Sequence, residues 1–156
     1  MDNKELTEYR QRLLEKTLQS AGAFCAACRS IPDLHKSVAG GWNIHQIAAH
    51  VRDADAQVYG LRIRRTIAED YPTFPNFDAD AWVASQYKAD EPLEKILGEF
   101  DNSIHEMVEW LKSQPTTVWS RLGRHEINGE HSLQTWVERS LAHIEEHLET
   151  VSKMES

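Results

Sequence analysis

Two histidines one helical turn apart stand near the end of this sequence, at the first and last positions of His143-Ile144-Glu145-Glu146-His147. Residues four apart on a helix are surface neighbours with Cβ atoms about 5–6 Å apart, so both imidazoles can reach one ion. The spacing predicts a divalent metal site. A solvated or hydrogen-bonded helix face is the alternative interpretation.

A third histidine, His50, has the same relation to its own helix. In the helix expected over residues 132–152, His143 and His147 share one flank of the apolar stripe, and His50 lies on the matching flank of the helix that opens at Asn43. Adjacent helices of a bundle can bring such borders together. Three histidines with one open position are the ligand set of a catalytic rather than a closed structural zinc site.

The other five histidines have no partner at ligand spacing on an apolar border. His45 is expected on the polar face of its helix. Two others precede the last helix closely enough to line a pocket, His125 and His131. The remaining two are expected at the surface or in loops, and they are His35 and His105.

Glu146 comes directly before a candidate ligand and could serve as a base beside the ion. A solvated glutamate is the alternative interpretation. The five residues from 143 to 147 also satisfy the His-x-x-Glu-His pattern of inverzincin proteases. Those enzymes need a further acidic ligand well downstream, and only a short segment follows His147, which argues against a protease.

Helical periodicity dominates the chain, and it predicts the elements that must position these histidines. Apolar residues recur at a spacing of three or four over residues 4–28, 43–61, 91–113 and 132–152. An aromatic, Pro-rich connection over 71–77 and a short helical piece over 81–87 separate the second and third of these segments. Asn128-Gly129 predicts the turn of a small hairpin or an ordered loop.

The predicted fold class is all-α. We expect a four-helix bundle with a short extra helix in the connection between the second and third long helices. Residues 1–156 are expected to form a single domain, because a chain of this length can bury its own core.

Charge and composition limit the classes of partner. The chain has 25 acidic and 17 basic residues and a formal net charge of -8, which disfavours nucleic acid. Arg62, Arg64 and Arg65 cluster, but on a helix they fan over different directions and predict a solvated face. No apolar run is long enough to span a membrane, and the first residues show no secretory signal, so a cytoplasmic protein is expected.

Cys25 and Cys28 form a Cys-x-x-Cys pair at the tail of a helical pattern, with no strand before it. A thioredoxin-like redox role needs a strand-helix-strand setting, and a zinc clip needs a second pair. The sequence therefore predicts buried, apolar thiols.

Three stretches of the chain resemble the DinB/YfiT-like family of metal-dependent four-helix-bundle proteins. They are Gly41-Trp42-Asn43-Ile44-His45-Gln46-Ile47-Ala48-Ala49-His50, the connection Phe77-Asp78-Ala79-Asp80-Ala81-Trp82, and residues 129–147 with their final His-x-x-x-His. The resemblance covers most of residues 5–153.

The resemblance implies a bundle in which His50, His143 and His147 hold a divalent ion, with water in the remaining positions, and it implies a homodimer. Many family members have an aspartate directly after the first histidine of the last pair, and this chain has Ile144 there. Zinc or nickel is the expected ion, with iron or manganese as alternatives.

Ligand chemistry and resemblance together predict an enzyme that acts on a small molecule. An ion held by three neutral imidazoles keeps most of its charge, so bound water ionises near pH 7 or a thiolate can bind. We expect a transferase of the thiol-dependent S-transferase type, using a low-molecular-weight thiol, or a hydrolase. The alternative is a non-catalytic bundle stabilised by metal, or a stress-associated interaction module.

Overall fold

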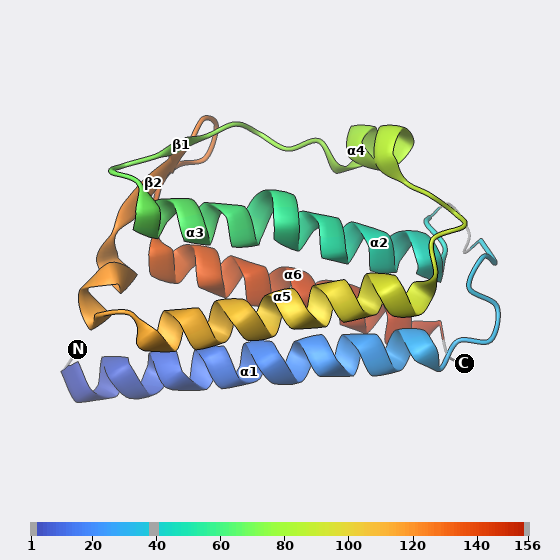
Figure 1. Ribbon diagram of the computed structural model, residues 1–156, viewed down its shortest axis with the longest axis horizontal. Coiled ribbons are helices and arrows are strands. Elements are labelled where there is room, and N and C mark those ends of the chain that lie inside the picture. Colours follow the sequence, from blue (N-terminus) through green and yellow to red (C-terminus); the bar gives the residue numbers. More distant parts are fainter. Residues whose placement is uncertain (1–2, 38–40, 155–156) are drawn as a thin grey trace.

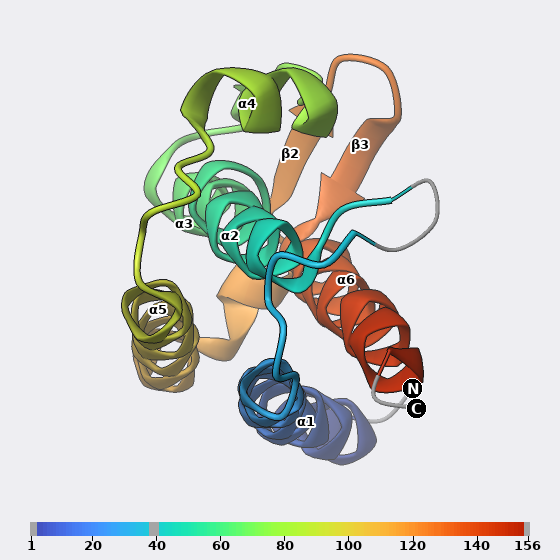
Figure 2. The same ribbon diagram turned by 90° about the vertical axis from the view of Figure 1, so that its right-hand side faces the viewer.

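Four long helical segments lie side by side in a bundle (Figure 1), and Figure 2 shows the bundle from one end. The computed structural model describes residues 3–37 and 41–154. The segments are α1 (Asn3–Arg29), the continuous run of α2 (Ile44–Ala54), η1 (Asp55–Tyr59) and α3 (Gly60–Ala68), α5 (Leu93–Ser113), and α6 (Leu133–Lys153). The predicted four-helix bundle with an extra helix is confirmed. No helix among the described residues is long and apolar enough to cross a bilayer.

The order of helix directions forces one long connection. α1 and α6 run one way along the bundle, and the α2–α3 run and α5 run the other way (Figure 1). The chain must therefore return along the length of the bundle between Ala68 and Leu93. This crossover contains the two-residue strand β1 (Thr73–Phe74) and the extra helix α4 (Ala79–Gln86).

A small three-stranded sheet holds one end of the crossover in place. The predicted hairpin forms from β2 (Leu122–His125) and β3 (Gly129–Ser132), which pair antiparallel, and Gly129 has the positive φ of 84° that its turn requires. β1 joins β2 in parallel, with Phe74 opposite His125. The proline-rich segment gave no sign of this pairing. The pairing of β1 with β2 holds the crossover against the hairpin.

Side-chain caps set where the two histidine-bearing helices begin. The Asn43 side chain accepts from the Gln46 backbone N–H, and the Gln46 side chain accepts from the Asn43 N–H, so the two residues form a capping box at the helix start that the sequence predicted. The Ser132 hydroxyl caps α6 by accepting from the Thr135 N–H. Such caps can be predicted from a sequence because they depend on local spacing alone.

The two cysteines lie in the core on α1. Cys25 and Cys28 are both buried and free. Burial is the main cause that raises the pKa of Cys25 to about 11 and that of Cys28 to about 12. Both therefore stay protonated and unreactive near neutral pH, and the prediction of buried thiols is confirmed.

A π-helical turn, η1, interrupts the helix that starts with α2. The Gly60 N–H bonds to the Asp55 carbonyl, five residues back, so the turn contains one residue more than an α-turn. The buried face shifts by one position after it. Leu61, which ends the expected apolar stripe, is 38% exposed, and Arg62 is only 8% exposed. The prediction that Arg62 lies on a solvated face is therefore wrong.

We expect Gly60→Ala to lower the free energy of unfolding by about 1–3 kcal/mol. A Cβ at this position would lie 2.6 Å from the Asp55 carbonyl oxygen, which the π-turn bond holds close. Chemical denaturation measures the change. The matched control is Gly98→Ala, where a Cβ meets nothing within 4 Å; there we expect a gain of about 0.5–1 kcal/mol from helix propensity. Equal effects at the two glycines would contradict the steric argument.

Candidate metal centre

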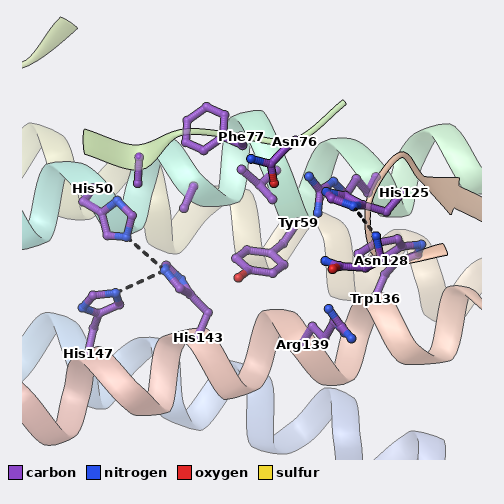
Figure 3. Close-up of a pocket in the computed structure, with 14 residues that line it drawn as sticks. His50, Tyr59, Asn76, Phe77, His125, Asn128, Trp136, Arg139, His143 and His147 are labelled. Atoms are coloured by element: carbon purple, nitrogen blue, oxygen red, sulfur yellow. Dashed lines mark hydrogen bonds between the residues drawn. The ribbon is translucent and has the colours of Figure 1, made fainter. Parts of the chain in front are cut away.

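Three imidazole nitrogens converge between α2 and α6 (Figure 3). His143 Nε2 lies 3.1 Å from His50 Nε2 and 3.2 Å from His147 Nε2. One ligand atom from each of the three lies within 4.8 Å of the others. The structure therefore brings together the three histidines whose helix flanks the sequence singled out.

The spacing of these nitrogens fits a divalent ion. Zinc–nitrogen bonds of 2.0–2.1 Å in a tetrahedral site place neighbouring nitrogens about 3.3–3.4 Å apart, and the two shorter separations are close to this. A neutral imidazole nitrogen without a proton is only an acceptor, and one proton can bridge only two such atoms. A cation satisfies all three lone pairs at once.

Aromatic neighbours set the directions of two of these rings. Trp42 packs against His50 with ring centroids 4.8 Å apart, and Tyr59 packs against His143 at 4.9 Å. The rings of His143 and His147, one turn apart on α6, have centroids 4.5 Å apart. The ligand geometry is thus held by packing on both helices.

Burial keeps the three imidazoles neutral. Burial first, and His147 second, lowers the pKa of His50 to about 4. Burial, with His147 and His50 nearby, lowers the pKa of His143 to about 3. Burial also lowers the pKa of His147, opposed by the charge of Glu146. Neutral imidazoles have the free lone pairs that a metal needs.

The three histidines form one end of a pocket of about 380 Å³, a volume that suits a small molecule. Its walls come from the α2–α3 run, α6, the crossover and the hairpin loop (Figure 3). Besides the three histidines, the residues that line the pocket include Tyr59, Arg62, Asn76, His125, Trp136 and Arg139.

Tyr59 lies between the histidines and the opposite end of the pocket (Figure 3). Burial is the largest cause that raises its pKa, so the hydroxyl keeps its proton at neutral pH and can donate to a bound molecule. Sequence reasoning missed Tyr59 because the residue closes the π turn. Only the wider turn brings this position to the pocket, and no local pattern announced it.

The histidines outside this cluster lie in three kinds of environment: buried against other segments, lining the pocket, or exposed. His45 is buried rather than on a polar face, because the residues after α4 cover that side of α2; its ring nitrogens lie 2.6 Å from the Tyr87 hydroxyl and 2.6 Å from the Glu91 carbonyl oxygen. The expectation for His45 is therefore wrong. His125 lines the pocket, as its place before α6 suggested, whereas His131 is not among the described residues that line it. His105 is exposed on α5, as expected.

Glu146 is exposed on α6 and is not among the described residues that line the pocket. Its charge nevertheless opposes the burial that lowers the pKa of His147, and it adds to the burial that raises the pKa of Tyr59. The carboxylate therefore lies at the outer edge of the histidine cluster, where a role as a base working through water stays a prediction.

The profile of the DinB superfamily matches residues 6–151, so the chain belongs to this superfamily. A relative from Oceanobacillus iheyensis, named provisionally as a metal-dependent hydrolase, is 28% identical over 117 residues. The match covers 70% of this chain and 62% of that relative. YfiT from Bacillus subtilis, described provisionally as a metal-dependent hydrolase of unusual four-helix-bundle topology, superposes with a TM-score of 0.80. It shares 17% identity, and the superposition covers 99% of this chain and 89% of YfiT, which establishes the shared fold.

We expect His50→Ala, His143→Ala and His147→Ala each to weaken zinc or nickel binding by more than about 100-fold, because loss of a mere hydrogen-bond partner of a ligand already costs 10- to 100-fold. Competition with a chromophoric chelator measures the affinity. The control is His105→Ala on the surface of α5. Equal loss in that variant, or unchanged binding in any of the three, would contradict the assignment.

The metal-free protein should lose stability as the pH falls from about 6.5 towards 4. An unfolded histidine takes up a proton near pH 6.5, whereas His50 and His143 in the fold do so only near pH 4 and 3. The unfolded state therefore holds more protons in this window, and stability is greatest above it. Denaturation of wild type and His143→Ala across this range measures the slope. The variant should show a slope smaller by about 1.4 kcal/mol per pH unit, and identical slopes would contradict buried neutral imidazoles.

Proposed function

We propose that this member of the DinB superfamily is a metal-dependent hydrolase of a small molecule, with the ion held by His50, His143 and His147. The observation that carries the proposal is the convergence of three neutral Nε2 atoms at the end of a small-molecule-sized pocket. The provisional names of the two relatives support hydrolysis. Three protein ligands leave room for water or substrate, as in catalytic zinc sites.

An ion in this site would supply a polarising charge and a water that ionises near pH 7. The surrounding side chains have separate tasks. The Tyr59 hydroxyl, protonated because burial raises its pKa, is placed to donate a hydrogen bond to a substrate oxygen that gains negative charge. Glu146, at the outer edge, could accept a proton through a water and return it to the leaving group.

Thiol-dependent transfer is the second candidate, because a three-imidazole site adds no negative charge and favours an anionic thiolate. The sulfur of a low-molecular-weight thiol would bond to the electrophilic carbon, the leaving group would depart with the bonding pair, and the thiol proton would pass to it. The thiol must be external, since burial raises the pKa of Cys25 to about 11 and of Cys28 to about 12.

The proposal also covers the identity of the ion, the oligomeric state and the location of the protein. We propose zinc or nickel, with iron or manganese as alternatives, because imidazole binds all of the first-row ions and availability decides among them. The family resemblance supports a homodimer, and a cytoplasmic location stays a prediction.

The test compares metal-loaded and chelator-treated protein on a panel of esters and amides, and on an electrophile with and without added cysteine. We expect hydrolysis that is lost on chelation and restored by zinc or nickel. Tyr59→Phe should lower kcat by about 100-fold with unchanged metal content, the usual effect of removing one donor to a developing oxyanion. Glu146→Gln tests the base in the same assay.

The two activities and the non-catalytic alternative give different results. Turnover only in the presence of cysteine would favour transfer over hydrolysis. Stoichiometric metal with no turnover on either panel, and a free energy of unfolding that rises with the ion, would indicate a metal-stabilised bundle instead. The matched control for Tyr59→Phe is Tyr71→Phe, on an exposed ring that bonds to Glu130 outside the pocket.

A further inference from the structure

We propose that the end of the pocket opposite the histidines is an anion subsite, in which Arg62 and Arg139 bind a carboxylate or phosphate group of the substrate. This inference rests on the proposed function, because it names the class of molecule that the site would process. The substrate is then a small molecule with two parts: an anionic group at the arginines and a cleavable bond at the ion.

Arg62 is a buried cation without a carboxylate partner. Its residue exposure is 8%, and its one hydrogen bond runs from Nη2 to the Pro75 carbonyl oxygen at 3.3 Å. None of the ion pairs among the described residues includes Arg62, and no carboxylate is among the charges that act on it. A buried charge is normally paired, and a guanidinium has five N–H donors in a fork that matches carboxylate and phosphate. Four of the five donors therefore remain for a ligand.

Arg139, on α6, lines the same pocket as Arg62, which is on α3. Its Cζ lies 5.8 Å from the Trp136 ring centroid, and the Arg62 Cζ lies 5.0 Å from it, so one indole contacts both cations. Burial lowers the pKa of Arg62, and the like charge of Arg139 lowers it further, as expected for two cations that line one pocket. Arg139 is exposed and forms no ion pair with any described carboxylate. An anion between them would remove the repulsion.

Two neutral donors complete the end of the pocket. The Nε1 atom of the fully buried Trp136 has no hydrogen-bond partner in the described structure. His125 Nδ1 accepts the backbone N–H groups of Ile127 and Asn128 at 3.1 and 3.0 Å, so the neutral ring carries its proton on Nε2. A buried N–H without an acceptor beside the cavity, together with two guanidinium groups that line it, indicates a ligand that is rich in acceptors.

The pocket differs in charge from the rest of the molecule. The chain as a whole has 25 acidic residues, yet none of the described residues lining the pocket is an aspartate or glutamate. Glu126 and Glu146 lie outside it, and Glu126 accepts a hydrogen bond from the Asn76 N–H on the crossover. A pocket of about 380 Å³ encloses a small molecule and not a nucleic-acid backbone.

Arg62 also has a structural task, since it ties the crossover to α3 through Pro75 and packs on Phe74 with its Cζ 5.8 Å from the ring centroid. Its variants can therefore lose stability. Arg139 has no such contact with the crossover among the described bonds, so Arg139→Gln tests the subsite without disturbing the fold. Arg124→Gln, on the exposed side of β2 and outside the pocket, removes the same charge and is the matched control.

The binding experiment titrates glutarate and inorganic phosphate separately into metal-free and zinc-loaded protein by calorimetry. We expect binding of at least one probe without metal, weakened about tenfold or more in Arg62→Met and about fivefold in Arg139→Gln, because a charge-assisted hydrogen bond is worth one or two powers of ten. Arg124→Gln should bind as wild type does. The preferred probe identifies the anion as a carboxylate or a phosphate.

The location of binding is read from the Trp136 indole N–H in a heteronuclear NMR spectrum, assigned with Trp136→Phe. We expect this resonance to move most on titration, because the Trp136 ring packs against both guanidinium groups that would bind the anion. No binding of either probe, equal binding in Arg139→Gln and wild type, or a shift confined to other indoles would each overturn the subsite.

A kinetic arm separates this inference from the proposed function. In zinc-loaded protein, an ester with a terminal carboxylate should have a higher kcat/KM than the same ester without it, and Arg139→Gln should remove that preference. Anion binding without turnover would support the subsite while the proposed function fails. Turnover with no preference for the anionic ester, and none of the binding effects above, would overturn the subsite while the function stands.

Discussion

The burial of three imidazoles that face one another is the interaction on which the site depends. Burial lowers the pKa of His50 to about 4 and that of His143 to about 3, so both rings are neutral near pH 7. One proton can bridge only two of the three Nε2 atoms that meet, so one acceptor is left unpaired. Such a cluster is unfavourable unless a cation occupies it. An ion that binds this cluster would therefore also stabilise the contact between α2 and α6. The ligand set arises because α1 and α5 bury the apolar stripes, which leaves a polar border between α2 and α6.

The π turn is the second constraint, and it separates the two functions of one helix. Before η1 the helix presents His50 to the metal end of the pocket. After η1 the inserted residue turns Arg62 inward in place of Leu61, and Tyr59 closes the turn between the two ends. An uninterrupted α-helix with this sequence would place Leu61 in the pocket wall and direct the guanidinium away from it. Gly60 permits the turn because a side chain there would collide with the Asp55 carbonyl oxygen.

Local patterns predicted the parts of the structure that depend on local physics. The four helices follow from apolar periodicity, the starts of α2 and α6 from the side chains of Asn43 and Ser132, and the hairpin from Asn128-Gly129. The convergence of the histidines was predictable because all three lie on the border of an apolar stripe, and the bundle leaves such borders facing each other.

Features that depend on contacts between distant segments could not be predicted from the sequence. The burial of His45 requires Tyr87 and Glu91, about forty residues away along the chain. The pairing of β1 with β2 requires the crossover to return past the hairpin. The burial of Arg62 was not predicted for a different reason, since the 3.6-residue period used to assign helix faces no longer holds beyond a π turn.

The charge of the molecule and the charge of its pocket act over different distances. A formal net charge of -8 repels anions at long range, but at physiological ionic strength this field is screened within about 8 Å. Inside the pocket the screening is weaker, because Arg62 is buried and no described carboxylate lines the walls. Short-range attraction therefore outweighs long-range repulsion for an anion small enough to enter. A polyanion too large for the pocket meets only the acidic exterior, so the same distribution of charge that favours a small anionic substrate disfavours nucleic acid.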